Sequence, residues 1–214
     1  MSGIMLNIVG GRFAPSVLAI GDAFGGGFYA GQISTAGNSI ADYNLVVGPN
    51  ASAESAAQWK NVNTATPGAD SNINGPQNTL DMVANGNATV YPAAHFCNDL
   101  TTGGFSDWYM PAKNELEVCY YNLKPTTTAN NTSSGINPNA VPARASNYTS
   151  GNPAQTSATN FQFTGAEDFT ATSYWSSTEK STTEAWVSYF SSGYQIYFTK
   201  DSTSVFRAVR RVAV

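Results

Sequence analysis

The sequence predicts an α+β fold, in which two helices pack on a mostly antiparallel sheet and long polar loops connect these elements. Two observations lead to this prediction. A helical pattern with clear start and stop signals lies at 111–124, and three strand patterns separated by short turns lie at the end of the chain. Helices and strands that are segregated along a chain in this way are typical of α+β domains.

The helix predicted at 111–124 is the best-marked element. Its apolar residues recur at the spacing of one helical face: Leu116, Cys119, Tyr120 and Leu123. Pro111 suits a first helical position, and Lys124 followed by Pro125 marks the end. Just upstream, Trp108 is a large apolar side chain with one N–H donor, and we expect it to be buried.

Two further helical patterns lie upstream, at 76–86 and 91–100. The first has Leu80, Val83 and Ala84 on its apolar side and Gly86 as a stop signal. In the second, the apolar side is made by Ala93, Ala94, Cys97 and Leu100. His95 falls on another face, so we expect a solvated residue rather than a catalytic base.

The two cysteines, Cys97 and Cys119, both lie on apolar faces of predicted helices. We expect two buried free thiols, with a disulfide between the helices as the alternative.

Three strand patterns close the chain, at 185–190, 194–199 and 204–212, and the turns between them predict an antiparallel meander. Trp175 and Trp186 are expected to support this structure. Aromatic residues alternate onto both faces of the strands, so one set is either covered by helices or available to a ligand. The candidate ligand surface comprises residues of these strands and of the preceding loop: Tyr148, Tyr189, Tyr194, Gln195 and Tyr197.

Residues 126–165 show no convincing periodicity and are rich in Asn, Thr, Ser, Pro and Gly. A structureless segment of this length is functional, disordered or misread. Its aromatic residues, Tyr148, Phe161 and Phe163, indicate that it is pinned to the body of the domain. No Asp or Glu occurs between Pro125 and Gly165, which argues against calcium-dependent sugar binding, since Ca²⁺ prefers several carboxylate oxygens.

Residues 1–18 are predicted to form an arm that precedes a single domain at 19–214. Ile4, Leu6 and Ile8 indicate a short apolar strand, which joins either the domain's own sheet or another chain. A glycine-rich hairpin region follows at 20–48. Its triple glycine, Gly25 to Gly27, leads into a strand and not into the helix that a phosphate cradle requires.

Only 11% of the 214 residues are charged, against about 25% in a typical soluble domain. The net charge of −4 and the pI near 4.8 offer no basic surface for phosphates, so nucleic acid is not an expected partner. No apolar run is long enough for a membrane span, and no secretory signal is recognisable. We therefore expect no membrane insertion, and synthesis and folding in a cytoplasm.

Several pairs of carboxylates in the sequence are candidates for catalysis. Glu115 and Glu117 lie two positions apart on a helix, so they point away from each other and cannot share a substrate. The other pairs lie in loops. Because the sequence offers no histidine-assisted nucleophile and no metal-ligand cluster, we expect neither an enzyme nor a bound metal or cofactor.

Four segments carry a resemblance to a known family: IGD before GGG at 20–27, GFSDWYMPAKNELE at 104–117, YWSSTE at 174–179 and FRAVRRV at 206–212. They resemble motifs of the Lcl C-terminal family, a widespread group of bacterial and bacteriophage domains. The resemblance implies a C-type-lectin-like fold, in which the long loop often forms the binding face. It also implies that Arg207 and Arg210 of the closing motif tie the sheet to a carboxylate such as Asp107 or Asp22.

The resemblance and the neutral polar composition favour a phage virion structural protein. Its lectin-like domain, at a fibre tip or on a capsid surface, would bind a host-surface receptor or glycan. The alternative is a decoration or cement protein of a capsid or tail that recognises no receptor. The expected partners are other virion proteins, contacted through the N-terminal arm, and further copies in a homo-oligomer. The expected location is the virion.

Overall fold

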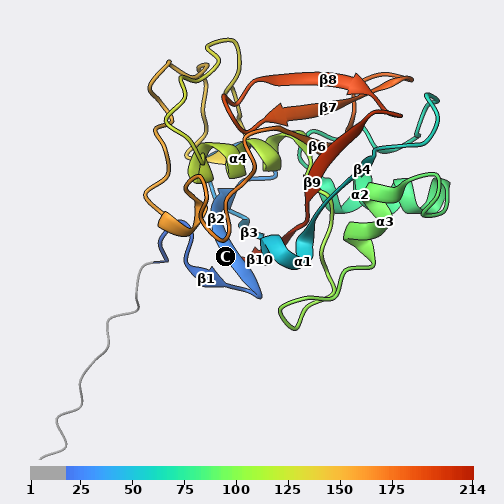
Figure 1. Ribbon diagram of the computed structural model, residues 1–214, viewed down its shortest axis with the longest axis horizontal. Helices are drawn as coiled ribbons and strands as arrows, with labels where there is room; N and C mark the ends of the chain where they lie inside the picture. Colours follow the sequence, from blue (N-terminus) through green and yellow to red (C-terminus); the bar gives the residue numbers. More distant parts are fainter. Residues whose placement is uncertain (1–17) are drawn as a thin grey trace, which may run out of the picture.

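The computed structural model describes residues 18–214, which form one body of helices packed with two five-stranded sheets (Figure 1). The predicted arm at 1–18 lies outside the described residues except for Leu18. The mixture of helices and mostly antiparallel strands confirms the α+β class. The prediction of one sheet was wrong, because the strands divide between two.

The first sheet gathers strands from both ends of the described chain. It contains β1 (Ala23–Phe24), β2 (Gly27–Ile33), β3 (Tyr43–Val47), β5 (Ala140–Val141) and β10 (Val209–Ala213). The order is β1-β2-β3-β10, with β5 paired to β2, and every pairing is antiparallel. The hairpin region predicted at 20–48 therefore supplies its centre.

The second sheet contains β4 (Glu54–Gln58), β6 (Ser173–Glu179), β7 (Glu184–Tyr189), β8 (Gln195–Thr199) and β9 (Thr203–Arg207). Its order is β4-β9-β6-β7-β8. Strands β6, β7 and β8 form the expected antiparallel neighbours. Strand β9 instead lies between β4 and β6 and runs parallel to β6, so the meander predicted through 204–212 was wrong.

The strand predicted at 204–212 divides at Ala208. The backbone N–H of this residue donates to the carbonyl of Ala53, and its own carbonyl accepts from Gly48. These two bonds hold Ala208 between the sheets, so β9 ends in the second sheet and β10 begins in the first. An uninterrupted strand pattern in the sequence gives no signal of such a change of partner.

Helices α2 (Gly75–Asn85), α3 (Pro92–Asn98) and α4 (Lys113–Leu123) match the three predicted helical segments, and a short α1 (Asn50–Ala53) precedes β4. The predicted apolar side of α2 was wrong, since Leu80 is 53% exposed and Ala84 is also exposed. The buried side carries Asn78, whose amide donates to Ser71 O and Ser177 Oγ, so hydrogen bonds hold this helix against β6.

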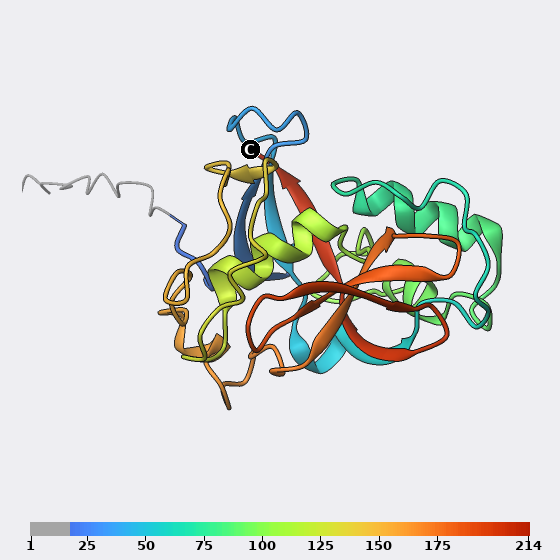
Figure 2. The ribbon, with the colours of Figure 1, turned by 90° about the horizontal axis from the view of Figure 1, so that it is seen from above.

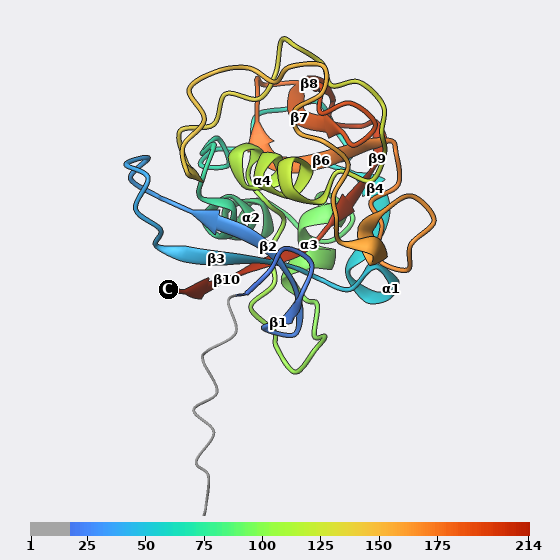
Figure 3. The ribbon, with the colours of Figure 1, turned by 90° about the vertical axis from the view of Figure 1, so that its left-hand side faces the viewer.

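Helix α4 lies between the two sheets and packs against β2 on one side and β6 and β7 on the other (Figures 2 and 3). Its predicted apolar residues Leu116, Cys119, Tyr120 and Leu123 are all buried. Cys97 and Cys119 are buried free thiols, as expected. No helix within residues 18–214 has the length and apolar character needed to cross a membrane.

The irregular segment after α4 folds back over that helix. Phe161, in the 3-10 helix η1 (Thr159–Phe161), is fully buried, and Tyr148 is only 5% exposed, whereas Phe163 is 62% exposed. The segment is therefore pinned, as its aromatic residues indicated. Much of it is a cover for α4 and not a freely displayed loop.

Candidate binding surface

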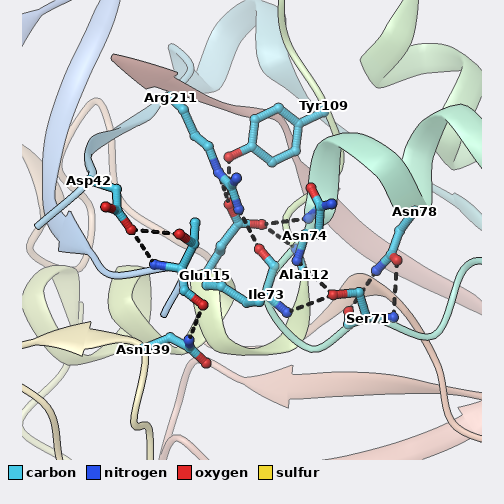
Figure 4. Close-up of polar contacts among 12 residues, drawn as sticks. Asp42, Ser71, Ile73, Asn74, Asn78, Tyr109, Ala112, Glu115, Asn139 and Arg211 are labelled. Carbon is cyan, nitrogen blue, oxygen red and sulfur yellow. Dashed lines mark hydrogen bonds and ion pairs between the residues drawn. The ribbon is translucent and has the colours of Figure 1, made fainter. Parts of the chain in front are cut away.

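Two buried carboxylates fix α4 in place, and the first is Glu115. Its Oε1 accepts hydrogen bonds from Tyr109 Oη at 2.6 Å and Arg211 Nε at 2.9 Å (Figure 4). Its Oε2 accepts from the backbone N–H groups of Ala112, at 2.8 Å, and Gly75, at 3.2 Å. Burial raises the pKa of the Glu115 carboxyl, while the Arg211 guanidinium opposes that effect. These four donors, one of which is the ion-pair partner Arg211, leave no room for a substrate.

Glu117 anchors the irregular segment to the opposite side of α4. It accepts hydrogen bonds from Tyr148 Oη, at 2.6 Å, and from the amide of Asn137, and it forms an ion pair with Arg144. The guanidinium of Arg144 also lies 4.0 Å from the ring centre of Tyr121. Glu115 and Glu117 thus bind different parts of the fold, and neither is placed to act with the other on a ligand.

The closing arginines are structural ties. Arg210 makes two hydrogen bonds to Asp107, of 2.7 and 2.8 Å. Asp107 is one of the two carboxylates that were expected to pair with a closing arginine. Arg207 is buried and pairs instead with Glu167, at 2.7 Å. Asp22 contacts no arginine among the described residues. Its carboxylate accepts the N–H of Ala19 and so closes a local turn, which corrects the expectation that it serves as an anchor for an arginine.

Three of the four tryptophans are buried, and each donates its indole N–H to a backbone carbonyl. Trp108 donates to Thr102 and Phe105 at 3.2 Å, Trp175 to Ala57 at 3.1 Å, and Trp59 to Ser176 at 2.9 Å. Trp186 differs, because it is only half-buried and its indole N–H has no hydrogen-bond partner within residues 18–214. It is not a core anchor like the other three.

The five residues predicted as a ligand surface do not form one surface. The prediction that Tyr148 belongs to this surface was wrong, because its ring is buried and its hydroxyl donates a hydrogen bond to Glu117. Tyr189 and Tyr194 each lie two positions along the strand from Val187 and Ile196, so they share the sheet face that covers the core around Trp175. Gln195 and Tyr197 lie on the other face, where Tyr197 is 43% exposed.

Gln195 and Tyr197 share their face with Trp186. Trp186 is the cross-strand partner of Tyr197, and the two rings meet edge to face with centres 5.8 Å apart. Lys113 Nζ, from the first residue of α4, lies 4.1 Å from the Trp186 ring. Lys180 Nζ, from the turn between β6 and β7, lies 5.8 Å from Trp186 and 5.6 Å from Tyr197. We call these residues the Trp186 ledge: Lys113, Lys180, Trp186, Gln195 and Tyr197.

The polar groups of the ledge are free to bind a ligand. Within the described chain, the indole N–H of Trp186, the hydroxyl of Tyr197 and the side-chain amide of Gln195 make no hydrogen bond, although the backbone N–H of Gln195 donates to Ser134 Oγ. Partial burial lowers the pKa of the Lys113 ammonium, Glu117 opposes this shift, and the nearby Lys180 adds to it. Aromatic rings beside free donors and acceptors suit an amphipathic ligand such as a sugar.

From the sequence, we named Gln195 and Tyr197 as candidate binding residues, assigned Trp186 to a supporting role and did not name the two lysines. The sequence did offer one signal for Lys113 and Lys180, because lysines are rare in a chain with only 11% charged residues. Their positions alone, 113 and 180, give no indication that they meet at one tryptophan.

Other hollows offer less chemistry. One hollow of about 510 Å³ runs along α3 and is lined mainly by apolar groups, with His95 and Asp99 at its side. His95 is partly buried and not fully solvated as predicted, because its Nε2 lies 2.8 Å from Gly86 O. Across residues 18–214, no cluster of three His, Cys, Asp or Glu side chains has metal-binding geometry.

A search of curated proteins finds no match to this chain. The sequence model of one family, the Lcl C-terminal domain, matches residues 53–210. That range contains Glu115, the Glu117 network, the Arg207–Glu167 and Arg210–Asp107 pairs and every residue of the Trp186 ledge. Arg211, the ion-pair partner of Glu115, lies one residue beyond it. The chain belongs to the Lcl C-terminal domain family.

Proposed function

We propose that this protein is a binding module, which displays the Trp186 ledge to a glycan or receptor on a host cell surface. The observation that carries the proposal is the pair of half-buried Trp186 and exposed Tyr197, whose free N–H and hydroxyl lie beside the free side-chain amide of Gln195. Rigid aromatic side chains with a polar edge supply contact area at low entropic cost, and they recur in recognition surfaces.

We also propose that the fold is C-type-lectin-like and that the protein works as part of a phage virion. The C-type-lectin-like fold is supported by the helices packed with antiparallel sheets and by the long irregular segment between α4 and β6. The role in a phage virion is supported by the resemblance of the four motifs and by the neutral polar composition of the chain. The segment at 1–18 would contact other virion proteins, and the complete protein would be a homo-oligomer.

A glycan array tests the binding function. The labelled protein should bind a subset of printed bacterial surface polysaccharides, and replacing both Trp186 and Tyr197 with alanine should weaken that binding about tenfold or more. Phe163→Ala is the matched control, because Phe163 is also an exposed aromatic residue but lies outside the ledge. Thermal melting of each variant shows whether the fold is intact.

Two results would contradict the proposal: binding to no polysaccharide or bacterial cell, or equal binding by the ledge variant. In either case the alternative, a decoration protein, becomes the better interpretation. It predicts that virions lacking the protein lose thermal or salt tolerance while adsorbing normally.

A further inference from the structure

The lysines and arginines of this chain are almost all committed to internal contacts. One of the ten, Arg12, precedes the described residues. Seven of the other nine direct their charged groups into hydrogen bonds or ion pairs: Lys60, Lys124, Arg144, Lys200, Arg207, Arg210 and Arg211. The remaining two are Lys113 and Lys180.

Lys113 and Lys180 both belong to the Trp186 ledge. Within residues 18–214, neither ammonium has a carboxylate within 4.0 Å or a hydrogen-bond acceptor. Both instead lie against the ring of Trp186. Two ammonium groups without a carboxylate in contact are thus brought to one aromatic residue, while the other described lysines and arginines make hydrogen bonds or ion pairs.

Burial partly desolvates Lys113 and the two ammonium groups repel each other, and the carboxylate of Glu117 offsets these effects only in part, since the pKa of Lys113 stays lowered. The ring faces compensate only partly, since a cation–π contact contributes about 0.5–1 kcal/mol at an exposed site. An anion placed between the lysines would relieve the repulsion, so the ledge is complementary to a negative group that lies beside an amphipathic body.

We infer that the ligand of the Trp186 ledge is an acidic polysaccharide, whose sugar carboxylate lies between Lys113 and Lys180 while its ring packs on Tyr197. This inference rests on the proposed binding function and adds the ligand class. A carboxylate is favoured over a phosphate because the ledge has two point charges and no free arginine, and arginine is the side chain that matches phosphate in a bidentate manner. The free Gln195 amide and Trp186 N–H suit sugar hydroxyls.

Polygalacturonate and hyaluronan are the test ligands, with dextran as a neutral polymer and a poly(glycerol phosphate) as the phosphate polymer. Affinity electrophoresis should show retardation of the protein by the two carboxylate polymers and not by dextran. Replacing Lys113 and Lys180 with glutamine should reduce the affinity about tenfold or more. Binding should also weaken as salt rises from about 0.01 to about 0.15 M, over which the screening length falls from about 30 to about 8 Å.

A variant with the same net charge controls for long-range repulsion. Ser157→Asp with Asn160→Asp adds two negative charges at exposed positions outside the ledge, so its net charge equals that of the double glutamine variant. It should keep the affinity of the original protein. A loss as large as that of the ledge variant would mean that overall charge, and not the ledge, controls binding.

Three results overturn the inference. Binding of neither carboxylate polymer, or equal binding by the double glutamine variant, refutes the acidic ligand. Preference for the phosphate polymer assigns the lysines to phosphate recognition instead. If the array still shows binding that depends on Trp186 and Tyr197, the proposed function stands and only the ligand class fails; if that binding is also absent, both fail.

Discussion

Replacing Arg211 with methionine tests how strongly the Glu115 network holds the fold. The change removes the counter-ion of a fully buried carboxylate and leaves three donors, from Tyr109, Ala112 and Gly75. Removing one partner of a buried ion pair costs about 3–5 kcal/mol. For a chain of this size, a loss of about 4 kcal/mol lowers the melting temperature by about 8–16 °C.

The measurement is a double-mutant cycle by urea unfolding, with Arg211→Met, Glu115→Gln and the two combined. Each single change leaves a buried group without its partner, whereas the combined change removes both charges. The double variant should therefore be more stable than the sum of the two losses predicts, by at least about 1 kcal/mol. Additive losses, or a cost below about 1 kcal/mol for Arg211→Met, would refute the reasoning.

The pH dependence of the Arg211→Met variant follows from the same geometry. Burial already raises the pKa of Glu115, and loss of the guanidinium removes the largest opposing effect. A carboxyl with a raised folded-state pKa contributes stability below its unfolded pKa, and this contribution is lost as the pH rises. The loss of stability in the Arg211→Met variant should accordingly be smaller near pH 4.5, the ordinary pKa of a glutamate carboxyl, than at neutral pH.

Three further predictions concern other sites. Hydrogen bonds from Arg210 lower the pKa of Asp107 below its ordinary 3.8, a contribution present above that value and lost in acid, so Asp107→Asn should be destabilising at pH 7 and nearly neutral near pH 2, by thermal melting. Burial raises the pKa of Cys97 and Cys119, so Ellman's reagent should label neither thiol until urea unfolds the protein; rapid labelling of the native state would contradict the buried positions. Tyr148→Phe removes a buried hydrogen bond to a carboxylate and should cost about 1.5–3 kcal/mol without changing glycan binding, since Tyr148 lies outside the ledge.

The sequence patterns correctly predicted those helices and strands that are determined by their own residues. The 111–124 pattern gave α4, beginning two residues later than expected because Ala112 is the cap residue. Strand β4 has the sequence ESAAQ, with no alternation of large apolar residues, and was missed. It is a strand because β9 pairs with it along five positions, which is information that lies far away in the chain.

The side of α2 that faces the core was mispredicted for a related reason. Hydrophobicity placed Leu80 inward, yet hydrogen bonds from Asn78 to Ser71 and Ser177 orient the helix. A buried amide that makes its hydrogen bonds is tolerated in a core, and its partners lie on other segments. Neither fact can be read from the helical pattern.

The ledge depends on the buried networks that position α4. The N–H of Lys113 donates to Thr178 Oγ1 in β6 at 2.9 Å, while Glu115, two residues later, joins the helix to β10 through Arg211. These contacts place the first residue of α4 above β7, which carries Trp186, and beside the turn that carries Lys180. The residues that hold the fold together therefore also bring the two free ammonium groups to one ring. That meeting requires three elements separated in the sequence. The strand pattern named Gln195 and Tyr197 as candidates, but it assigned Trp186 to a supporting role and gave no sign of the two lysines.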